Sequence, residues 1–177
     1  MKKLVMILAL ATGTYFAANA QAPEGFQFGA GIRAALPIGD FSDSHSFGIG
    51  AEVQGEYGFS SMVSGVITSG YTSFFGKSTD VGGISIKYDA IGYIPFLAGV
   101  RVYPSSQFFI GGQVGYGLFT GNGNSTGAFN YQPQIGYNGS NFQVALNFNA
   151  MTKDGSTSSH LGLTGIYKFG GSGSAKK

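Results

Sequence analysis

The chain has no cysteine and no tryptophan, and only 10% of its 177 residues are charged. Without cysteine it can form neither disulfides nor thiolate metal sites. The charged fraction is far below the ~25% of ordinary soluble domains, so the chain cannot cover a water-facing surface in the usual way. After residue 20 there is also no run of ~20 apolar residues, which excludes a helical membrane protein.

Glycine and apolar residues are abundant instead, with 31 glycines and 43% hydrophobic residues. This composition is the opposite of the disordered signature. Without the first 20 residues, acidic and basic residues are equal in number. No basic patch is available for nucleic acid, so we expect no nucleic-acid partner. The composition therefore indicates a β-rich membrane protein.

The N-terminal segment has the three parts of a secretory signal peptide. Met1-Lys2-Lys3 is positive, residues 4–17 are mainly apolar, and Ala18-Asn19-Ala20 has the small-x-small form of a cleavage site. We predict that residues 1–20 are removed before Gln21, although an N-terminal membrane anchor is an alternative. Residues 21–169 are then the folded domain. Residues 170–177, rich in Gly, Ser and Lys, are predicted to form a flexible periplasmic tail.

Apolar and polar or small residues alternate along most of the remaining chain. Phe26, Phe28, Ala30 and Ile32, for example, alternate with Gln27, Gly29, Gly31 and Arg33. This period of two is that of a strand with one apolar face. It predicts eight strands, over residues 25–36, 46–57, 61–73, 87–103, 107–119, 127–137, 141–151 and 159–169. We therefore predict an all-β fold, an eight-stranded antiparallel up-and-down transmembrane β-barrel.

The predicted connections alternate between short and long. The short ones lie at residues 58–60, 104–106 and 138–140, and Asn138-Gly139 favours a type I′ turn. The longer ones lie at 37–45, 74–86, 120–126 and 152–158. Short turns of such barrels face the periplasm and longer loops face outwards, so both chain ends are predicted to be periplasmic.

Charged and amide side chains fall on the face opposite the apolar one. A Lys or Arg at mid-depth in hydrocarbon costs about 2–4 kcal/mol, so this face is predicted to line the bore of the barrel. We expect His160 to take part in the hydrogen bonds inside the bore. Because eight strands leave a bore that side chains about fill, we expect it to be plugged or narrow. The predicted polar network consists of Arg33, Glu52, Glu56, Lys87, Asp89, Arg101, Gln113, Gln132, Gln134, Gln143, Asn147, Asn149 and Lys168.

Aromatic residues gather near both ends of the predicted strands, as in the girdles of membrane barrels. The girdle at the turn side is predicted to contain Phe26, Tyr57, Tyr103, Phe108, Tyr137, Phe142, Tyr167 and Phe169. The girdle at the loop side is predicted to include Phe47, Tyr71, Phe74, Tyr116, Phe119, Phe129, Tyr131 and Phe148.

Four stretches together resemble a known class of proteins: residues 36–41 (LPIGDF), 47–57 (FGIGAEVQGEY), 94–103 (IPFLAGVRVY) and 161–169 (LGLTGIYKF). They look like the small outer-membrane β-barrel proteins common in Bacteroidetes-type bacteria, which are similar in architecture to the OmpX and OmpA barrels. The resemblance implies a Gram-negative outer membrane, contact with its lipid and lipopolysaccharide, and folding by the barrel assembly machinery. The implied assembly signal is Leu161, Leu163, Gly165, Tyr167 and Phe169.

Catalytic chemistry is weakly supported. Small outer-membrane enzymes that act on lipid A use His and Ser, and here His45 follows Asp43 and Ser44, while His160 follows Ser158 and Ser159. A hydrolase needs its nucleophile, base and carboxylate in contact, which neighbouring positions do not ensure. We predict a non-enzymatic, monomeric barrel without cofactor or metal, in a structural or interaction role. The alternatives are a narrow channel for small solutes, a lipid A-modifying enzyme, or loops that bind calcium loosely.

Overall fold

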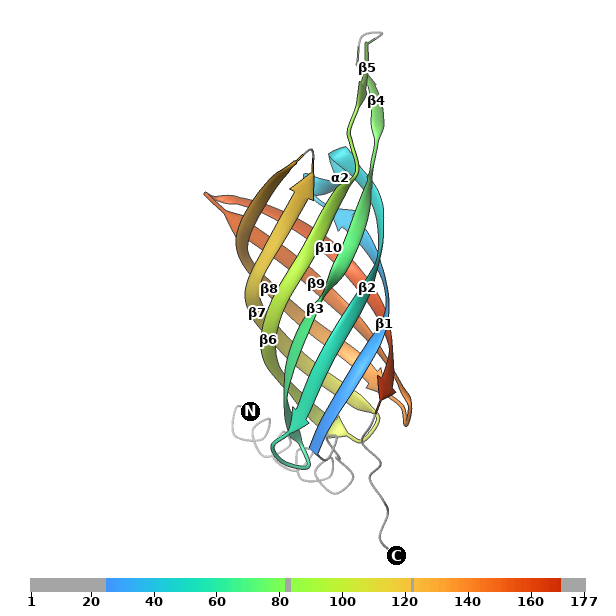
Figure 1. Ribbon diagram of the computed structural model, residues 1–177, viewed down its shortest axis with the longest axis vertical. Helices are drawn as coiled ribbons and strands as arrows, with labels where there is room; N and C mark the ends of the chain where they lie inside the picture. Colours follow the sequence, from blue (N-terminus) through green and yellow to red (C-terminus); the bar gives the residue numbers. More distant parts are fainter. Residues whose placement is uncertain (1–24, 82–83, 122, 170–177) are drawn as a thin grey trace, which may run out of the picture.

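The alternating segments form eight long strands that close into one antiparallel barrel in the computed structural model (Figure 1). The structure describes residues 25–81, 84–121 and 123–169; the predicted signal peptide and tail lie outside them. The strands are β1 (Gly25–Ile38), β2 (His45–Gly58), β3 (Val63–Gly76), β6 (Ile91–Ser105), β7 (Phe108–Gly121), β8 (Asn124–Asn138), β9 (Phe142–Lys153) and β10 (Ser156–Phe169). Their order around the wall is β1-β10-β9-β8-β7-β6-β3-β2. The predicted fold class is confirmed.

The first and last strands pair with each other and so close the sheet. Their register runs from Phe28 opposite Phe169 to Ile38 opposite Ser159 without interruption. On its other edge β1 pairs with β2 from Gly25 to Ala35. Closure leaves no free sheet edge along the wall, which removes the unpaired backbone groups that an open sheet would carry.

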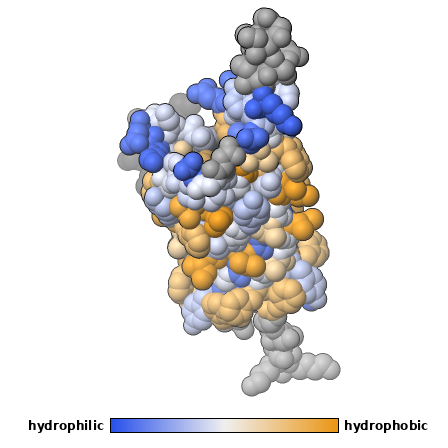
Figure 2. Space-filling view, turned by 45° about the horizontal axis from the view of Figure 1, so that its top comes forward, coloured by the Kyte–Doolittle hydropathy of each residue, from blue (hydrophilic) through white to orange (hydrophobic). Residues whose placement is uncertain are grey.

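Side chains along each strand point alternately out of the wall and into the bore. Ile32 is 73% exposed, whereas its neighbour Arg33 is 2% exposed. The outward residues are mostly apolar, and Figure 2 shows them as a broad apolar band over the wall, with hydrophilic residues gathered at one end. The alternation of side chains along each strand therefore gives the barrel an apolar outer face and a polar inner face.

At the end of the barrel where longer connections are predicted, called the loop end, two of the connections contain secondary structure. Residues 74–86 are not one irregular loop: β3 continues to Gly76, and β4 (Ser78–Val81) pairs with β5 (Ile84–Lys87). This two-stranded ribbon projects beyond the barrel wall (Figure 1). The connection from β1 to β2 contains a short helix, α2 (Phe41–Ser44). No helix in the described part of the chain is long and apolar enough to cross a membrane.

At the loop end, β7 to β10 extend through most of the residues predicted as loops, so that two residues separate β7 from β8 and two separate β9 from β10. Polar residues such as Thr126 and Ser156 pair there as strand. Polar and apolar residues do not alternate at these positions. The strands predicted from alternation therefore end too early.

The type I′ turn also lies elsewhere than predicted. In the described residues neither Asn138 nor Gly139 has a positive φ, whereas Asp154 (φ 49°) and Gly155 (φ 80°) both do. Positive φ at both central residues is the requirement of a type I′ turn, and Asp-Gly satisfies it as well as Asn-Gly. At the opposite end, called the turn end, three residues separate β8 from β9, which leaves no two-residue turn at Asn138-Gly139.

Two glycines on the β1–β10 pair provide a test of closure. A Cβ on Gly31 would overlap the main-chain oxygen of Gly165, whereas a Cβ on Gly165 would meet nothing within 4 Å. We expect Gly31→Ala to lower the free energy of unfolding by about 1–3 kcal/mol, because the neighbouring backbone must move. Gly165→Ala should change it by less than about 1 kcal/mol. Urea unfolding in detergent micelles, followed by the gel mobility of unheated samples, measures both; equal effects would contradict this account of the closing strands.

Candidate functional site

The middle of the bore contains two arginine-centred networks, and the first is built on Arg33 of β1. Its Nη1 donates to Glu52 Oε2 at 2.9 Å, and its Nη2 donates to Gln132 Oε1 at 2.7 Å and Asn147 Oδ1 at 2.5 Å. These acceptors come from β2, β8 and β9. Since β8 is three places away from β1 around the eight-stranded wall, Arg33 links strands across the bore.

The second network is built on Arg101 of β6. Its Nη1 donates to Glu56 Oε2 at 2.6 Å and to Gln143 Oε1 at 2.9 Å. Its Nη2 donates to Gln54 at 3.2 Å and Gln134 at 3.3 Å. The partners belong to β2, β8 and β9, and Arg101 is 1% exposed. Gln54 and Gln143 are also bonded to each other, so the Arg101 network is a second set of links across the bore.

An aromatic group closes the second network towards the turn end. The Arg101 guanidinium lies 4.5 Å from the centre of the Phe109 ring, which is itself 5.7 Å from the ring of Tyr103. The Tyr103 hydroxyl donates to Glu56. Tyr103 is fully buried, so its predicted place in the outer girdle is wrong. It lies two residues from Arg101, and strand alternation puts both on the inner face.

An apolar cluster fills the bore towards the loop end. It contains Ala35, Phe41, Phe74, Tyr93, Ala128 and Met151, with Ile91 and Phe119 packed against it. Phe41 comes from α2, and its ring lies 5.0 Å from that of Phe74. Phe74 is fully buried and Phe119 packs against this cluster, so their predicted places in the loop-side girdle are wrong as well. Strand alternation with Thr72 and Thr68, both buried, accounts for the inward position of Phe74.

A hollow of about 330 Å³ opens between β7, β8, β9 and β10 at the loop end. Its lining includes Ala128 and Met151 of the apolar cluster, and Thr126, Lys153 and Ser156 near the rim. The hollow therefore reaches the outer side of the cluster.

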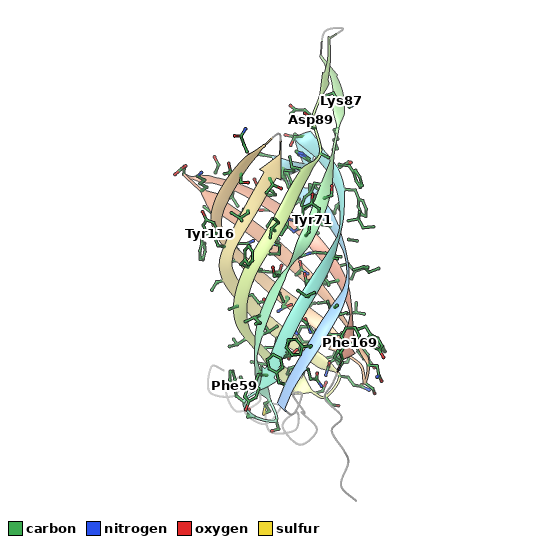
Figure 3. The ribbon with its side chains drawn as sticks, in the orientation of Figure 1. Phe59, Tyr71, Lys87, Asp89, Tyr116 and Phe169 are labelled. Carbon is green, nitrogen blue, oxygen red and sulfur yellow. The ribbon has the colours of Figure 1, made fainter. Side chains whose placement is uncertain are left out.

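Most residues of the predicted polar network lie in the bore, and two do not. Lys87 is in β5 of the projecting ribbon and Asp89 follows it; both are exposed beyond the barrel (Figure 3). Their prediction as bore residues is wrong, because β6 begins only at Ile91 and the predicted strand began at residue 87. The buried members are Arg33, Glu52, Glu56, Arg101, Gln113, Gln132, Gln134, Gln143, Asn147, Asn149 and Lys168.

Lys168 and Gln113 bond to side chains other than the two arginines. Lys168 lies at the turn end, where its Nζ donates to Asn138 Oδ1 at 2.8 Å and to the Gly139 carbonyl at 2.5 Å. It thereby holds the β8–β9 connection to β10. Gln113 accepts a hydrogen bond from Thr68 at 2.8 Å. Gln54 joins the Arg101 network although it was outside the predicted set; its place between Glu52 and Glu56 on the inner face was the available signal.

The other girdle residues predicted at the turn side lie on the outer wall, where Tyr137 is half-buried and stacks on Phe142 with ring centres 5.8 Å apart. The exposed ones are Phe26, Tyr57, Phe108, Phe142, Tyr167 and Phe169. The predicted assembly-signal residues occupy the outer face of β10, from Leu161 to Phe169. Their recognition by an assembly machinery stays a prediction.

The two histidines have different surroundings. His45 Nδ1 lies 2.8 Å from Ser44 Oγ, and its Nε2 lies 3.2 Å from the main-chain oxygen of Asp89. The group opposite Ser44 is thus a carbonyl and not the carboxylate of a catalytic triad. His160 is buried between the rings of Phe74 and Tyr93, at 5.1 and 5.3 Å. Neither of its ring nitrogens has a hydrogen-bond partner among the described residues, so the prediction that it joins the polar network is wrong.

Solved structures with the same fold include small outer-membrane barrels. The chain matches Ail, the attachment invasion locus protein of Yersinia pestis, with a TM-score of 0.56 and 16% identity over 82% of this chain and 99% of Ail. It matches the N-terminal β-barrel domain of Pseudomonas aeruginosa OprF with a TM-score of 0.55 and 11% identity over 82% and 98% of the two chains. For the outer membrane protein OprG of the same organism the values are 0.50, 12%, 85% and 99%.

The class that the fold defines is therefore the eight-stranded barrel found in outer-membrane proteins. At these identities the likeness is one of fold. No family model and no curated protein matches the sequence. The narrower resemblance to barrels of Bacteroidetes-type bacteria stays a prediction.

The Arg101–Glu56 pair provides a test of the polar network. Both side chains are 1% exposed, and their charged atoms are 2.6 Å apart. We expect Arg101→Met to lower the free energy of unfolding by about 3–5 kcal/mol, because it leaves a buried carboxylate without its cation. Adding Glu56→Gln should restore most of this loss. The same urea titration measures both variants, and a double variant no more stable than the single one would contradict a charge-based contribution.

The contrast between His160 and Tyr93 tests the apolar cluster. His160→Phe should raise the free energy of unfolding by about 1–3 kcal/mol, because it replaces two unpartnered buried nitrogens by carbon within an aromatic group. Tyr93→Phe is the matched control, since its hydroxyl accepts hydrogen bonds from Asn130 and Asn149. We expect that control to be less stable than the parent protein. Two changes of the same sign would refute the assignment.

Proposed function

We propose that the chain is an integral protein of a Gram-negative outer membrane, with a bore blocked by its own side chains and a structural or interaction role. The signal peptide directs its export and is then cleaved, and the barrel assembly machinery folds it. In the membrane it is a monomer surrounded by lipid and lipopolysaccharide. The closed wall and its apolar outer face support the membrane setting, because a bilayer core offers no partner to unpaired backbone groups. The turn end then faces the periplasm and the loop end faces outwards.

The observation that carries the proposal of a blocked bore is the pair of arginine networks. Arg33 and Arg101 each join β8 and β9 to strands on the other side of the bore through hydrogen bonds of 2.5–3.3 Å. An ion that crosses the barrel would have to break these charge-assisted bonds, which are stronger than bonds between neutral groups. Tyr103 and Phe109 lie on one side of the networks, and the cluster around Phe74 on the other.

The projecting ribbon supports the interaction role. β4 and β5 pair only with each other, over four residue pairs from Ser78–Lys87 to Val81–Ile84. Each therefore has an outer edge of backbone groups that no other described strand uses, and an extended peptide can add to such an edge. An isolated two-stranded ribbon is only marginally stable in water, which favours its use against a partner. Ail, a neighbour in fold, is by name an attachment protein.

A narrow channel is the second candidate, and the hollow at the loop end favours it. The hollow provides an entrance of about 330 Å³ on the outer side. It ends, however, against Ala128 and Met151, which belong to the buried apolar cluster. A conducting path would need this cluster and both arginine networks to separate. A lipid A-modifying enzyme has less support, because the contacts of Ser44 and His45 include no orienting carboxylate.

Conductance in planar bilayers tests the proposal. We expect the inserted protein to give no discrete current steps. Arg101→Gly combined with Glu56→Gly removes one charge of each sign and the larger network. Only the Arg33 network and the apolar cluster then have to separate for an ion to cross, so short-lived steps should appear. Lys153→Gly combined with Asp154→Gly removes the same charges at the exposed rim and should stay silent. Insertion is verified by the shift in gel mobility on heating; regular steps from the unchanged protein would refute a blocked bore and favour the channel.

A further inference from the structure

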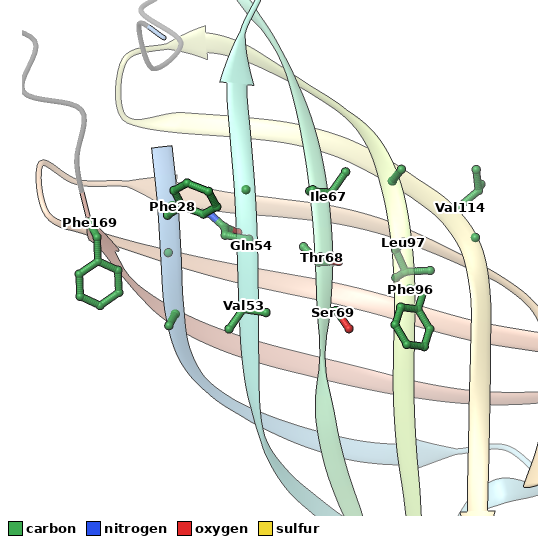
Figure 4. Close-up of a pocket in the computed structure, with 15 residues that line it drawn as sticks. Phe28, Val53, Gln54, Ile67, Thr68, Ser69, Phe96, Leu97, Val114 and Phe169 are labelled. Carbon is green, nitrogen blue, oxygen red and sulfur yellow. The ribbon is translucent and has the colours of Figure 1, made fainter. Parts of the chain in front are cut away.

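A groove of about 690 Å³ lies on the outer wall of the barrel (Figure 4). Its lining comes from six neighbouring strands, from Phe169 on β10 through β1, β2, β3 and β6 to Val114 on β7. No charged residue lines it, and the exposed side chains Phe28, Ile67 and Phe96 border it. The groove is continuous with the apolar outer wall.

Small outward residues form the floor of the groove. Neighbouring strands β1, β2, β3 and β6 contribute Ala30, Gly55, Ser69 and Ala98 to its lining. In the register of the sheet, Ala30 is opposite Val53, Gly55 is opposite Ile67, and Ser69 is opposite Phe96. A small residue therefore lies beside a larger one at each step, and the larger side chains form the sides of a channel across the strands.

The groove runs obliquely along the barrel. At one end Phe169 is the last residue of β10, at the turn end, while at the other Val114 is the seventh residue of the fourteen-residue β7. Five strand spacings of ~4.8 Å give a length of ~24 Å. With the usual strand tilt of ~40°, this length corresponds to a rise of ~15 Å, which is half of a ~30 Å hydrocarbon core. The groove therefore extends from one membrane interface to the middle of the bilayer.

We propose that this groove binds one acyl chain of a phospholipid in the periplasmic leaflet. The inference rests on the proposed membrane location and orientation, which put the Phe169 end of the groove at the periplasmic interface. A phospholipid has its headgroup at that interface and its chain directed towards the midplane, as the groove is. The lining offers a hydrocarbon chain only apolar contact apart from side chains such as Ser69, and no charge that would have to be buried.

A second copy of the barrel fits the groove less well. The outer wall of a barrel is convex, so a neighbouring barrel would touch the rings of Phe28 and Phe96 at the sides and leave the floor at Ala30 and Ala98 empty. A single flexible chain can follow the floor over its whole length. Because a bilayer contains no water to fill such a hollow, a chain that fits it should be held longer than a lipid on the flat part of the wall.

Lipid retention measured by native mass spectrometry tests this site. The protein is inserted into vesicles of palmitoyl-oleoyl-phosphatidylethanolamine, released in mild detergent and weighed. We expect one retained phospholipid on most of the folded protein. Gly55→Leu, which fills the groove, should reduce the retained fraction at least fivefold. Ala98→Leu should have the same effect without a new Cβ, and so tests the groove even if Gly55→Leu does not fold.

The matched control is Gly112→Leu. Gly112 is also a strand glycine; it is exposed, it lies outside the groove lining, and a Cβ there meets nothing within 4 Å. Its retention should equal that of the unchanged protein. In vesicles that also contain lipopolysaccharide, the adduct should still have the phospholipid mass. Inserted protein without an adduct, or equal retention by the groove and control variants, would overturn the groove alone; failure to insert, seen as no heat-dependent gel shift, would overturn the proposed membrane function with it.

Discussion

The pairing of β1 with β10 is the contact on which every other feature of the barrel depends. It joins the two ends of the sheet over eleven residue pairs, from Phe28–Phe169 to Ile38–Ser159. Without it, both strands would present a row of unpaired backbone groups, which is costly in any apolar solvent. The pairing also creates an inside: only in a closed wall do Arg33 and Asn147, 114 positions apart, come within hydrogen-bond distance.

Closure separates two environments with opposite requirements. The outer face carries apolar and small residues, and the inner face carries two buried ion pairs with amide side chains around them. Burial of an arginine is unfavourable unless its donors are used, and here each guanidinium has several acceptors from strands on different sides of the bore. The same bonds that satisfy the buried charges thus also tie the strands together across the bore.

Periodicity predicted the strands well where one face is apolar throughout. The first segment, with Phe26 to Leu36 alternating against Gln27 to Ala35, was predicted within two residues of β1. Periodicity predicted the strand ends poorly where the alternating pattern stops. Lys87 and Asp89 were included in a strand that begins only at Ile91, and polar residues after Gly121 and Thr152 were predicted as loops although they continue in hairpins. Where a strand extends beyond an apolar solvent, it no longer needs an apolar face. Its residues then do not alternate, and the pattern does not indicate a strand.

Residue chemistry was a weaker guide than alternation at Tyr103 and Phe74. Both are aromatic and lie near strand ends, which suggested a girdle, yet both are buried in the bore. Tyr103 and Phe74 each lie two positions from an inner residue, Arg101 and Thr72 respectively. Alternation therefore puts both on the inner face of the wall. Aromatic residues serve at membrane interfaces and in cores alike, and only their position along the strand distinguishes the two.

The sequence by itself determined the number of strands in the barrel wall, the fold class and the side of the wall on which most residues lie, because these follow from a local period of two. Only the tertiary structure decided which inner residues meet, that α2 brings Phe41 onto the apolar cluster, and that small residues of four strands form one groove. These outcomes depend on the register between strands and on closure of the wall. Both are set by contacts between residues far apart in the chain, on which a local pattern carries no information.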